Sequence, residues 1–117
     1  ILARFLTWVG LTKIDFAADG VEGLAKLEAS GADLVILDID MPRMNGLQLC
    51  REIRKAPRWA DMPVLMQISP GSDPAGVRSF EAGASDIITK PINPGECMAR
   101  VRLHLEKQFF LRNLTNF

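Results

Sequence analysis

Residues 33–46 read DLVILDIDMPRMNG, and this stretch decides the fold. Within it, residues 34–37 form a continuous apolar run that ends at Asp38, a pattern typical of a central parallel strand buried on both faces. A carboxylate at the tip of a buried strand is costly unless another group pairs with it or uses it. A helix-capping or turn-forming aspartate is the plainer alternative. Downstream, Pro42 and the pair Asn45 and Gly46 indicate turns.

Helical and strand-like patterns alternate on both sides of this stretch. The predicted helices cover residues 1–10, 20–29, 47–56, 75–82 and 95–116, and the predicted strands cover 12–17, 34–37, 63–68 and 86–89. This alternation favours an α/β fold in which helices cover both faces of a parallel sheet. In such folds the chemistry gathers at the carboxyl ends of the strands. Asp38 follows one of these ends, and Lys90 and Pro91 follow another.

Composition narrows the classes of function. The chain has 117 residues, the size of one domain, and its 14 basic residues balance its 14 acidic ones. We therefore expect no direct binding to nucleic acid or to a membrane. A cytoplasmic location is expected, because no apolar run approaches the roughly 20 residues that span a bilayer and no signal peptide is visible. Cys50 and Cys97 lack metal-type spacing and are expected to be buried or half-buried thiols.

Three segments resemble the receiver domain of bacterial two-component response regulators. Residues 33–46 are similar to its phosphorylation loop, and residues 80–91, FEAGASDIITKP, to the segment that carries its lysine. Residues 18–24 are more weakly similar to the start of its second helix. The resemblance covers nearly the whole chain and implies a flavodoxin-like, doubly wound parallel sheet of five strands in the order 2-1-3-4-5. It also implies a signalling domain and not an enzyme.

The resemblance assigns roles to individual residues. Asp38 would be the nucleophile that takes a phosphoryl group from a phosphohistidine on a partner histidine kinase or phosphotransfer protein. Mg²⁺ would be held by the Asp38 carboxylate, by the backbone carbonyl of Asp40, and by an acidic pair that ends the first strand. Lys90 would bind the phosphoryl oxygens. The peptide bond between Lys90 and Pro91 is expected to be cis.

The sequence departs from the family pattern at its beginning. It opens within the expected first helix, so the first strand and its acidic pair would precede Ile1. We expect residues 1–105 to be a receiver domain that lacks this strand here, and we expect the preceding residues to exist in the natural protein.

A second departure concerns the switch positions, where the family places a Ser or Thr and an aromatic residue. Counting from Asp38 and Lys90 puts Ile68 and Ile87 at these two positions. An isoleucine cannot donate a hydrogen bond to a phosphoryl oxygen, although a one-residue bulge would bring Ser69 into place. Asp40 adds a carboxylate that would either repel the incoming phosphoryl group or help to hold the metal.

The last predicted helix bears on partners. It runs past the length that covers a sheet of this size, and Phe109, Phe110, Leu111 and Leu114 would be exposed on a lone domain. We interpret residues 106–117 as a linker to an output domain, of diguanylate cyclase or histidine kinase type by resemblance. A homodimer is expected through the last helix or through the face formed by the fourth helix, the fifth strand and the fifth helix.

Two alternative functions remain open at this point. The chain could be a receiver-like adaptor that dimerises without a phosphorylation switch, which Ile68 and Ile87 favour. Asp38 and Asp40 also resemble, weakly, the nucleophile loop of haloacid-dehalogenase-like phosphatases, but Met41 and Pro42 follow where that loop usually continues with Thr or Val. The single histidine, His104, is expected at the surface or at an interface, and Trp8 and Trp59 are expected to be packing or loop residues.

Overall fold

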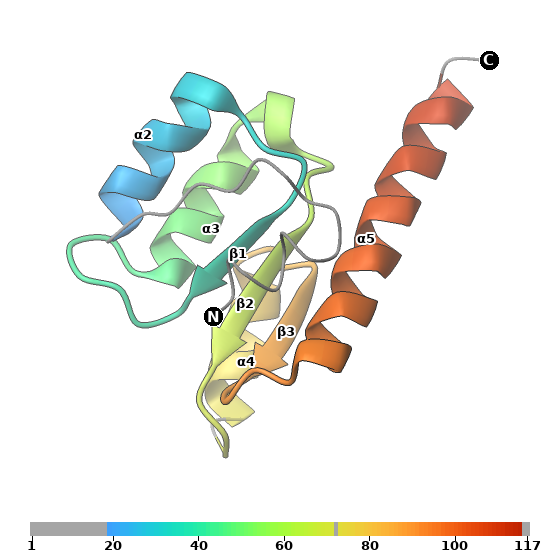
Figure 1. Ribbon diagram of the computed structural model, residues 1–117. Coiled ribbons are helices and arrows are strands. Elements are labelled where there is room, and N and C mark those ends of the chain that lie inside the picture. The colour runs from blue at the N-terminus through green and yellow to red at the C-terminus, as the bar shows by residue number, and fades with distance from the viewer. Residues whose placement is uncertain (1–18, 72, 116–117) are drawn as a thin grey trace.

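The computed structural model describes residues 19–71 and 73–115. The helix predicted at 1–10, the strand predicted at 12–17 and Trp8 lie outside the described residues. Figure 1 shows strands and helices alternating along the described chain. The elements are α2 (Gly20–Ser30), β1 (Val35–Asp38), α3 (Gly46–Lys55), the 3₁₀ turn η1 (Pro57–Trp59), β2 (Val64–Ile68), α4 (Asp73–Glu81), β3 (Asp86–Thr89) and α5 (Pro94–Thr115).

The described strands form one parallel sheet in the order β1-β2-β3. Val35 is paired with Val64 on one side of β2, and Leu65 is paired with Asp86 on the other. The predicted α/β class is therefore confirmed, and these strands have the order expected for strands 3, 4 and 5 of the flavodoxin-like sheet. All three point the same way, so Asp38, Ile68 and Thr89 lie at one edge.

Side chains of β2 alternate between two apolar layers, because successive residues of a strand point to opposite faces of the sheet. Val64, Met66 and Ile68 belong to the larger cluster, which also contains Leu49 and Ile53 of α3. The smaller cluster joins the sheet to α5, the helix that lies beside β3 in Figure 1. Its buried members are Leu65, Ile88, Cys97 and Val101. Helices thus cover both faces, and β2 is the buried centre of the described sheet.

The prediction that β1 is buried on both faces is wrong for the described structure. Leu37 is buried, but Val35, Ile36 and Asp38 are only half-buried. The reason is the position of β1 at the edge of the described sheet, where only β2 is paired with it among residues 19–71 and 73–115. The apolar run alone does not distinguish an edge strand from a central one.

The chain turns at Asn45 and Gly46, as predicted, and α3 begins there: Asn45 is its N-cap and Gly46 its first residue, one position before the predicted start at residue 47. The Asn45 side chain accepts a hydrogen bond from Gln48 N at 2.9 Å, and the Gln48 side chain accepts one from Asn45 N at the same distance. This reciprocal capping box satisfies two backbone donors that a helix start leaves open. Gly46 packs so tightly against β1 that a Cβ atom there would lie 2.5 Å from the Asp38 carbonyl oxygen.

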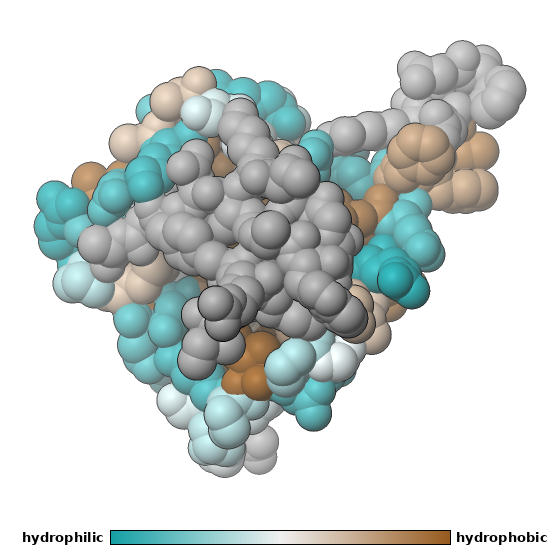
Figure 2. Space-filling model, in the orientation of Figure 1, coloured by the Kyte–Doolittle hydropathy of each residue, from teal (hydrophilic) through white to brown (hydrophobic). Residues whose placement is uncertain are grey.

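The final helix, α5, runs for 22 residues and confirms the long helix predicted at 95–116. Its first half packs on the sheet, and its C-terminal part stands clear of the sheet (Figure 1). Exposed apolar side chains gather on this free part, as the space-filling view also shows (Figure 2). Phe109 is 68% exposed, Phe110 62% and Leu114 53%, which confirms the expectation of an uncovered apolar end.

The two cysteine thiols are buried, as the sequence predicts. Cys50 and Cys97 are free and fully buried, and burial raises the pKa of both thiols, which makes them inert packing residues. Trp59 is buried in the larger cluster, as a packing residue should be. Among the helices of the described residues, none combines the length and the apolar character that a membrane crossing requires.

We expect Gly46→Ala to lower the free energy of unfolding by about 1–3 kcal/mol, because the new methyl group meets backbone atoms that cannot move aside. Urea denaturation of the full-length protein measures this change. Gly76→Ala in α4 is the matched control, since a Cβ atom there would meet Ile87 at an ordinary 3.4 Å. We expect the control to stay within about 1 kcal/mol of the parent protein, and an equal loss in both variants would contradict the packing argument.

Candidate functional site

Asp38 and Lys90 meet at the carboxyl edge of the sheet. The Lys90 Nζ atom lies 2.8 Å from Oδ1 and 2.8 Å from Oδ2 of Asp38, although 52 positions separate the two residues in the chain. Lys90 follows β3, and its backbone N–H donates to the Ile68 carbonyl at 2.8 Å. The side chains are 32% exposed for Lys90 and 37% for Asp38, so this ion pair is open to solvent and to a reactant. The peptide bond between Lys90 and Pro91 is cis.

The chain after β1 turns back toward the Asp38 carboxylate. The Asp40 backbone N–H donates to Asp38 Oδ1 at 2.9 Å. Ile39 N donates to the Gln67 carbonyl at 3.1 Å, and Gly46 N donates to the Ile39 carbonyl at 3.2 Å. The loop that joins β1 to α3 is therefore held at its first residues, on one side by β2 and on the other by the start of α3. The Asp40 side chain is exposed beside the pair.

The oxygen donors at this edge suit a hard divalent cation in their chemistry. The Asp38 carboxylate and the carboxylate and carbonyl of Asp40 are oxygen ligands on residues two positions apart. Within residues 19–71 and 73–115, no group of three or more His, Cys, Asp or Glu residues could hold a metal ion. Mg²⁺ keeps several waters and often binds through only one or two carboxylates, so the donors present fit part of such a site.

The expected switch positions lie beside the site, but they are apolar. Ile68 is 6% exposed at the end of β2, and Ile87 is half-buried on β3. Both side chains approach Gly76 of α4, where an added Cβ atom would lie 3.4 Å from Ile87 Cδ1 and 3.8 Å from Ile68 Cδ1. Ser69 follows β2 and is exposed. The two expected switch positions therefore meet α4 through aliphatic side chains.

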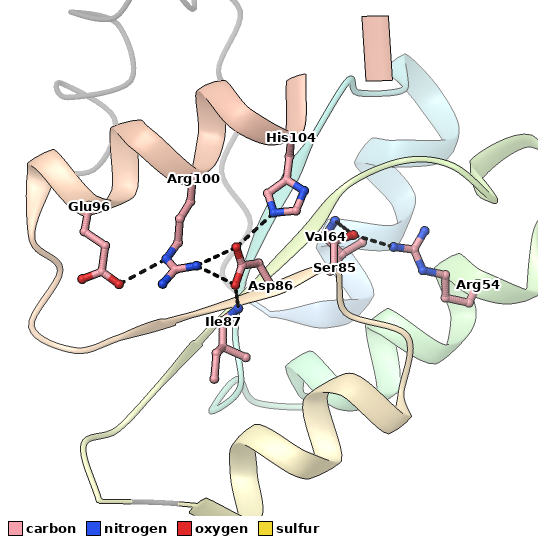
Figure 3. A network of polar contacts seen from close by, with 8 residues as sticks. All are labelled: Arg54, Val64, Ser85, Asp86, Ile87, Glu96, Arg100 and His104. Carbon is pink, nitrogen blue, oxygen red and sulfur yellow. Dashed lines mark hydrogen bonds and ion pairs between the residues drawn. The ribbon is translucent and has the colours of Figure 1, made fainter. Parts of the chain in front are cut away.

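A polar network holds the start of β3, the strand that leads to Lys90, as Figure 3 shows. Asp86 accepts two hydrogen bonds from Arg100 Nη1 of α5, at 2.9 and 2.8 Å, and its Oδ2 atom lies 3.0 Å from His104 Nε2. Burial acts to raise the pKa of Asp86, but the bonds from His104 and Arg100 outweigh it and lower the pKa below its ordinary value. The carboxylate therefore stays charged and ties α5 to the sheet.

The prediction that His104 lies at the surface is wrong, and its place at an interface stays a prediction. Its side chain is only 13% exposed, because α5 places it four residues after Arg100 on the face that meets Asp86. On the other side of β3, Arg54 of α3 donates to the Gly83 carbonyl at 2.8 Å and to Ser85 Oγ at 3.2 Å. Sequence reasoning missed these contacts, since only the fold brings the partners together.

A second unpredicted contact supports the loop itself. Asp19 is buried at the start of α2, and its Oδ2 atom accepts a hydrogen bond from Arg43 Nε at 2.7 Å. The sequence signal for Asp19 was its place before Gly20 at a helix start, where aspartate commonly caps the helix. That signal predicts the cap and gives no hint of the arginine.

Comparison with known proteins identifies the family. Residues 1–102 match the response regulator receiver domain. The chain belongs to this family. The expected two-component receiver is thereby confirmed, the haloacid-dehalogenase-like alternative is excluded, and the chain is not an enzyme. A receiver domain implies a partner histidine kinase, and the family typically uses Mg²⁺.

Curated relatives and solved structures agree with this assignment. The DNA-binding dual master transcriptional regulator RpaA of Synechocystis sp. is 37% identical over 78% of this chain and 38% of its own length. The transcriptional regulatory protein YvrH of Bacillus subtilis is 35% identical over 93% of this chain and 45% of its own length. The chain thus spans less than half the length of these relatives.

Two crystal structures give the same fold. The signal receiver domain of a signal transduction histidine kinase from Syntrophus aciditrophicus superposes with a TM-score of 0.83 at 31% identity, over 91% of this chain and 80% of that one. NtrX from Brucella abortus superposes with a TM-score of 0.88 at 28% identity, over 98% of this chain and 25% of that one.

We expect Asp86→Asn to lower the free energy of unfolding at pH 7 by about 1.5–3 kcal/mol, since it weakens charge-assisted hydrogen bonds in a mostly buried place. The pKa of Asp86 is lowered in the folded state, so its contribution is present above the ordinary value of 3.8 and is lost as the pH falls through the folded value. The difference between variant and parent in urea denaturation should therefore shrink at pH 3.

Glu96→Gln is the control for this measurement. Glu96 is exposed and bonds Arg100 Nε at 3.2 Å without reaching β3. Its loss should change the free energy of unfolding by less than about 1 kcal/mol. A gap between the Asp86 variant and the parent that is the same at pH 3 and pH 7 would contradict the ion-pair explanation.

Proposed function

We propose that this receiver domain is phosphorylated on Asp38 by a phosphohistidine of its partner kinase or phosphotransfer protein, in the cytoplasm. The observation that carries the proposal is the contact of Lys90 Nζ with both carboxylate oxygens of Asp38, 2.8 Å from each, at the open edge of the sheet. A cation in this position can stabilise the negative charge of the carboxylate and then that of an incoming phosphoryl group.

The reaction is a transfer between two nucleophiles. An Asp38 carboxylate oxygen forms a bond to phosphorus while the bond between phosphorus and the histidine nitrogen breaks, and that nitrogen takes a proton as it leaves. The product is an acyl phosphate on Asp38. Lys90 binds the phosphoryl oxygens, and Asp40 N–H keeps one carboxylate oxygen of Asp38 in place through its 2.9 Å bond.

The chain supplies donors for Mg²⁺ from the same two acidic residues. The Asp38 carboxylate and the backbone carbonyl of Asp40 would hold the ion. When bound, Mg²⁺ neutralises the negative charge that gathers as two anionic groups approach one another. The exposed Asp40 carboxylate adds to that negative charge, which strengthens the need for the ion. Ser69, exposed after β2, is a hydroxyl candidate for a phosphoryl oxygen.

We propose that residues 1–105 are the receiver domain and that residues 106–117 lead to an output domain. The length of α5 and the end of the family match at residue 102 support this division. The relatives named above are transcriptional regulators, and RpaA is named as DNA-binding, which supports a DNA-binding output in the same protein. The balanced charge of this domain favours no direct DNA contact by the domain itself. One of the similar solved structures is the receiver domain of a histidine kinase, which supports a histidine kinase output as an alternative. A diguanylate cyclase output is supported by sequence resemblance alone.

We expect the full-length protein, incubated with Mg²⁺ and acetyl phosphate, to gain the mass of one phosphoryl group, and Asp38→Asn to gain none. Lys90→Met should slow the gain roughly a hundredfold, because it removes a cation from the charge that develops in transfer. Asp61→Asn, which changes an exposed aspartate in the turn before β2, is the control and should react like the parent. A full gain of mass in Asp38→Asn would end the proposal.

An adaptor that dimerises without a phosphorylation switch is the second candidate. It is favoured by the aliphatic contact of Ile68 and Ile87 with Gly76, which offers no hydroxyl and no aromatic side chain to reorient. Such an adaptor would use exposed apolar surface on α4 and α5, where Phe80 is 51% exposed and Phe110 62%.

Sedimentation of the full-length protein with and without beryllofluoride separates the two candidates. For a phosphorylation switch, we expect beryllofluoride to tighten self-association by at least about tenfold, which is a coupling of roughly 1.4 kcal/mol. Phe110→Glu should weaken association through the last helix, and Phe80→Glu should weaken it through the α4 side. Equal association with and without beryllofluoride, in a protein that binds it at Asp38, would favour the adaptor.

A further inference from the structure

The loop between Asp38 and α3 rests on the start of α2. Gly20 N donates to the Met44 carbonyl at 2.9 Å. A Cβ atom at position 20 would lie 2.1 Å from that carbonyl oxygen, so the approach requires glycine. Met44 lies near the end of the loop that follows Asp38, and the start of α2 therefore supports this loop.

Asp19 adds a charged contact beside this backbone contact. Its Oδ1 atom accepts a hydrogen bond from Glu22 N at 2.9 Å and caps α2, while its Oδ2 atom accepts one from Arg43 Nε at 2.7 Å. The Asp19 side chain is 8% exposed and that of Arg43 62%. The bond from Glu22 N and the guanidinium of Arg43 lower the pKa of Asp19, so the carboxylate is charged at neutral pH. One carboxylate thus serves a helix end and a loop at the same time.

Arg43 has a backbone conformation that needs such support. Its φ angle is 62°, in the left-handed region that residues with a Cβ atom seldom adopt. The nearby bonds of the loop are short-range: Met44 N donates to the Pro42 carbonyl at 2.7 Å, and Asp40 N donates to Asp38 Oδ1 at 2.9 Å. An ion pair that holds the Arg43 side chain also holds the left-handed residue, and with it the path of the chain from Asp40 to Met44.

We propose that Asp19 and Arg43 are positioning residues for phosphorylation of Asp38. Their ion pair fixes the loop so that the Asp40 backbone stays against the Asp38 carboxylate, which keeps the nucleophile and the neighbouring oxygen donors in one arrangement. This inference rests on the proposed function, because it assumes that Asp38 is the nucleophile. It assigns to α2, which contributes no group to the site itself, a role in setting the rate.

Two substitutions break the pair without removing the structure around it. Asp19→Asn keeps a side-chain oxygen for Glu22 N, so the helix cap survives while the charge is lost. Arg43→Gly removes the guanidinium and accepts the left-handed conformation without strain. Arg43→Lys keeps a positive charge as the conservative variant. Lys55→Gln is the control, because it breaks an ion pair on α3, Lys55 with Glu52 at 3.0 Å, that does not touch the loop.

The measurements are the initial rate of phosphorylation of the full-length protein by acetyl phosphate with Mg²⁺, and amide hydrogen exchange in the metal-free protein. We expect Asp19→Asn and Arg43→Gly to slow phosphorylation roughly threefold to tenfold and to speed exchange of the amides of residues 40–44. The amides of β2 and α5 should keep their protection. Arg43→Lys should give an intermediate rate, and Lys55→Gln should match the parent.

The outcomes separate this inference from the proposed function. Parental rates and parental exchange in both Asp19→Asn and Arg43→Gly would overturn it, and so would slower phosphorylation accompanied by faster exchange throughout the domain, which is plain destabilisation. A parent protein that takes no phosphate would defeat the proposed function, and loss of loop protection in the variants would then still establish the positioning contact.

Discussion

The ion pair between Asp38 and Lys90 is the contact on which the site depends, and it is a consequence of sheet topology. Each residue lies at the carboxyl end of a strand, and the parallel sheet brings those ends to one edge. The central strand, β2, sets the distance between the two residues, because Ile39 N donates to the Gln67 carbonyl and Lys90 N donates to the Ile68 carbonyl. Residues far apart in the chain meet because β2 is buried between two apolar layers that fix its position. The geometry of the site therefore depends on the packing of the core.

Much of the fold could be predicted, because local patterns and the family motif pointed the same way. The bounds of β3 and the start of α5 at Pro94 follow from turn residues and apolar periodicity. The burial of β1 could not be predicted, since an apolar run gives no information on whether a second strand lies beside it. The helix predicted at 47–56 begins one residue earlier, at Gly46, and the capping role of Asn45 was not predicted, because the same residue type caps helices and forms turns.

The two charged residues of the site could be predicted from the sequence, but the contacts that hold the elements around them could not. The motifs located Asp38 and Lys90 as residues that should meet, and the structure places them 2.8 Å apart. Asp19, Arg43 and His104 gave no comparable signal, because each depends on a partner from another element. Such partners follow from tertiary packing, which local spacing does not encode. The pair at the edge, in contrast, is what the fold and the family lead one to expect.

The attachment of α5 has a mechanical consequence. Asp86 holds the helix at Arg100 and His104, and Leu105 and Gln108 beyond them are still packed or buried. Seven residues follow Gln108 up to Thr115. At about 1.5 Å per residue, this arm is roughly 10 Å long. A tilt of about 10° at its base would carry its tip about 2 Å, because a helix transmits rotation as a stiff rod. The Asp86 carboxylate thus links the long last helix directly to the strand that leads to Lys90, so a displacement of β3 would be passed on to the exposed aromatic side chains at the far end of the helix.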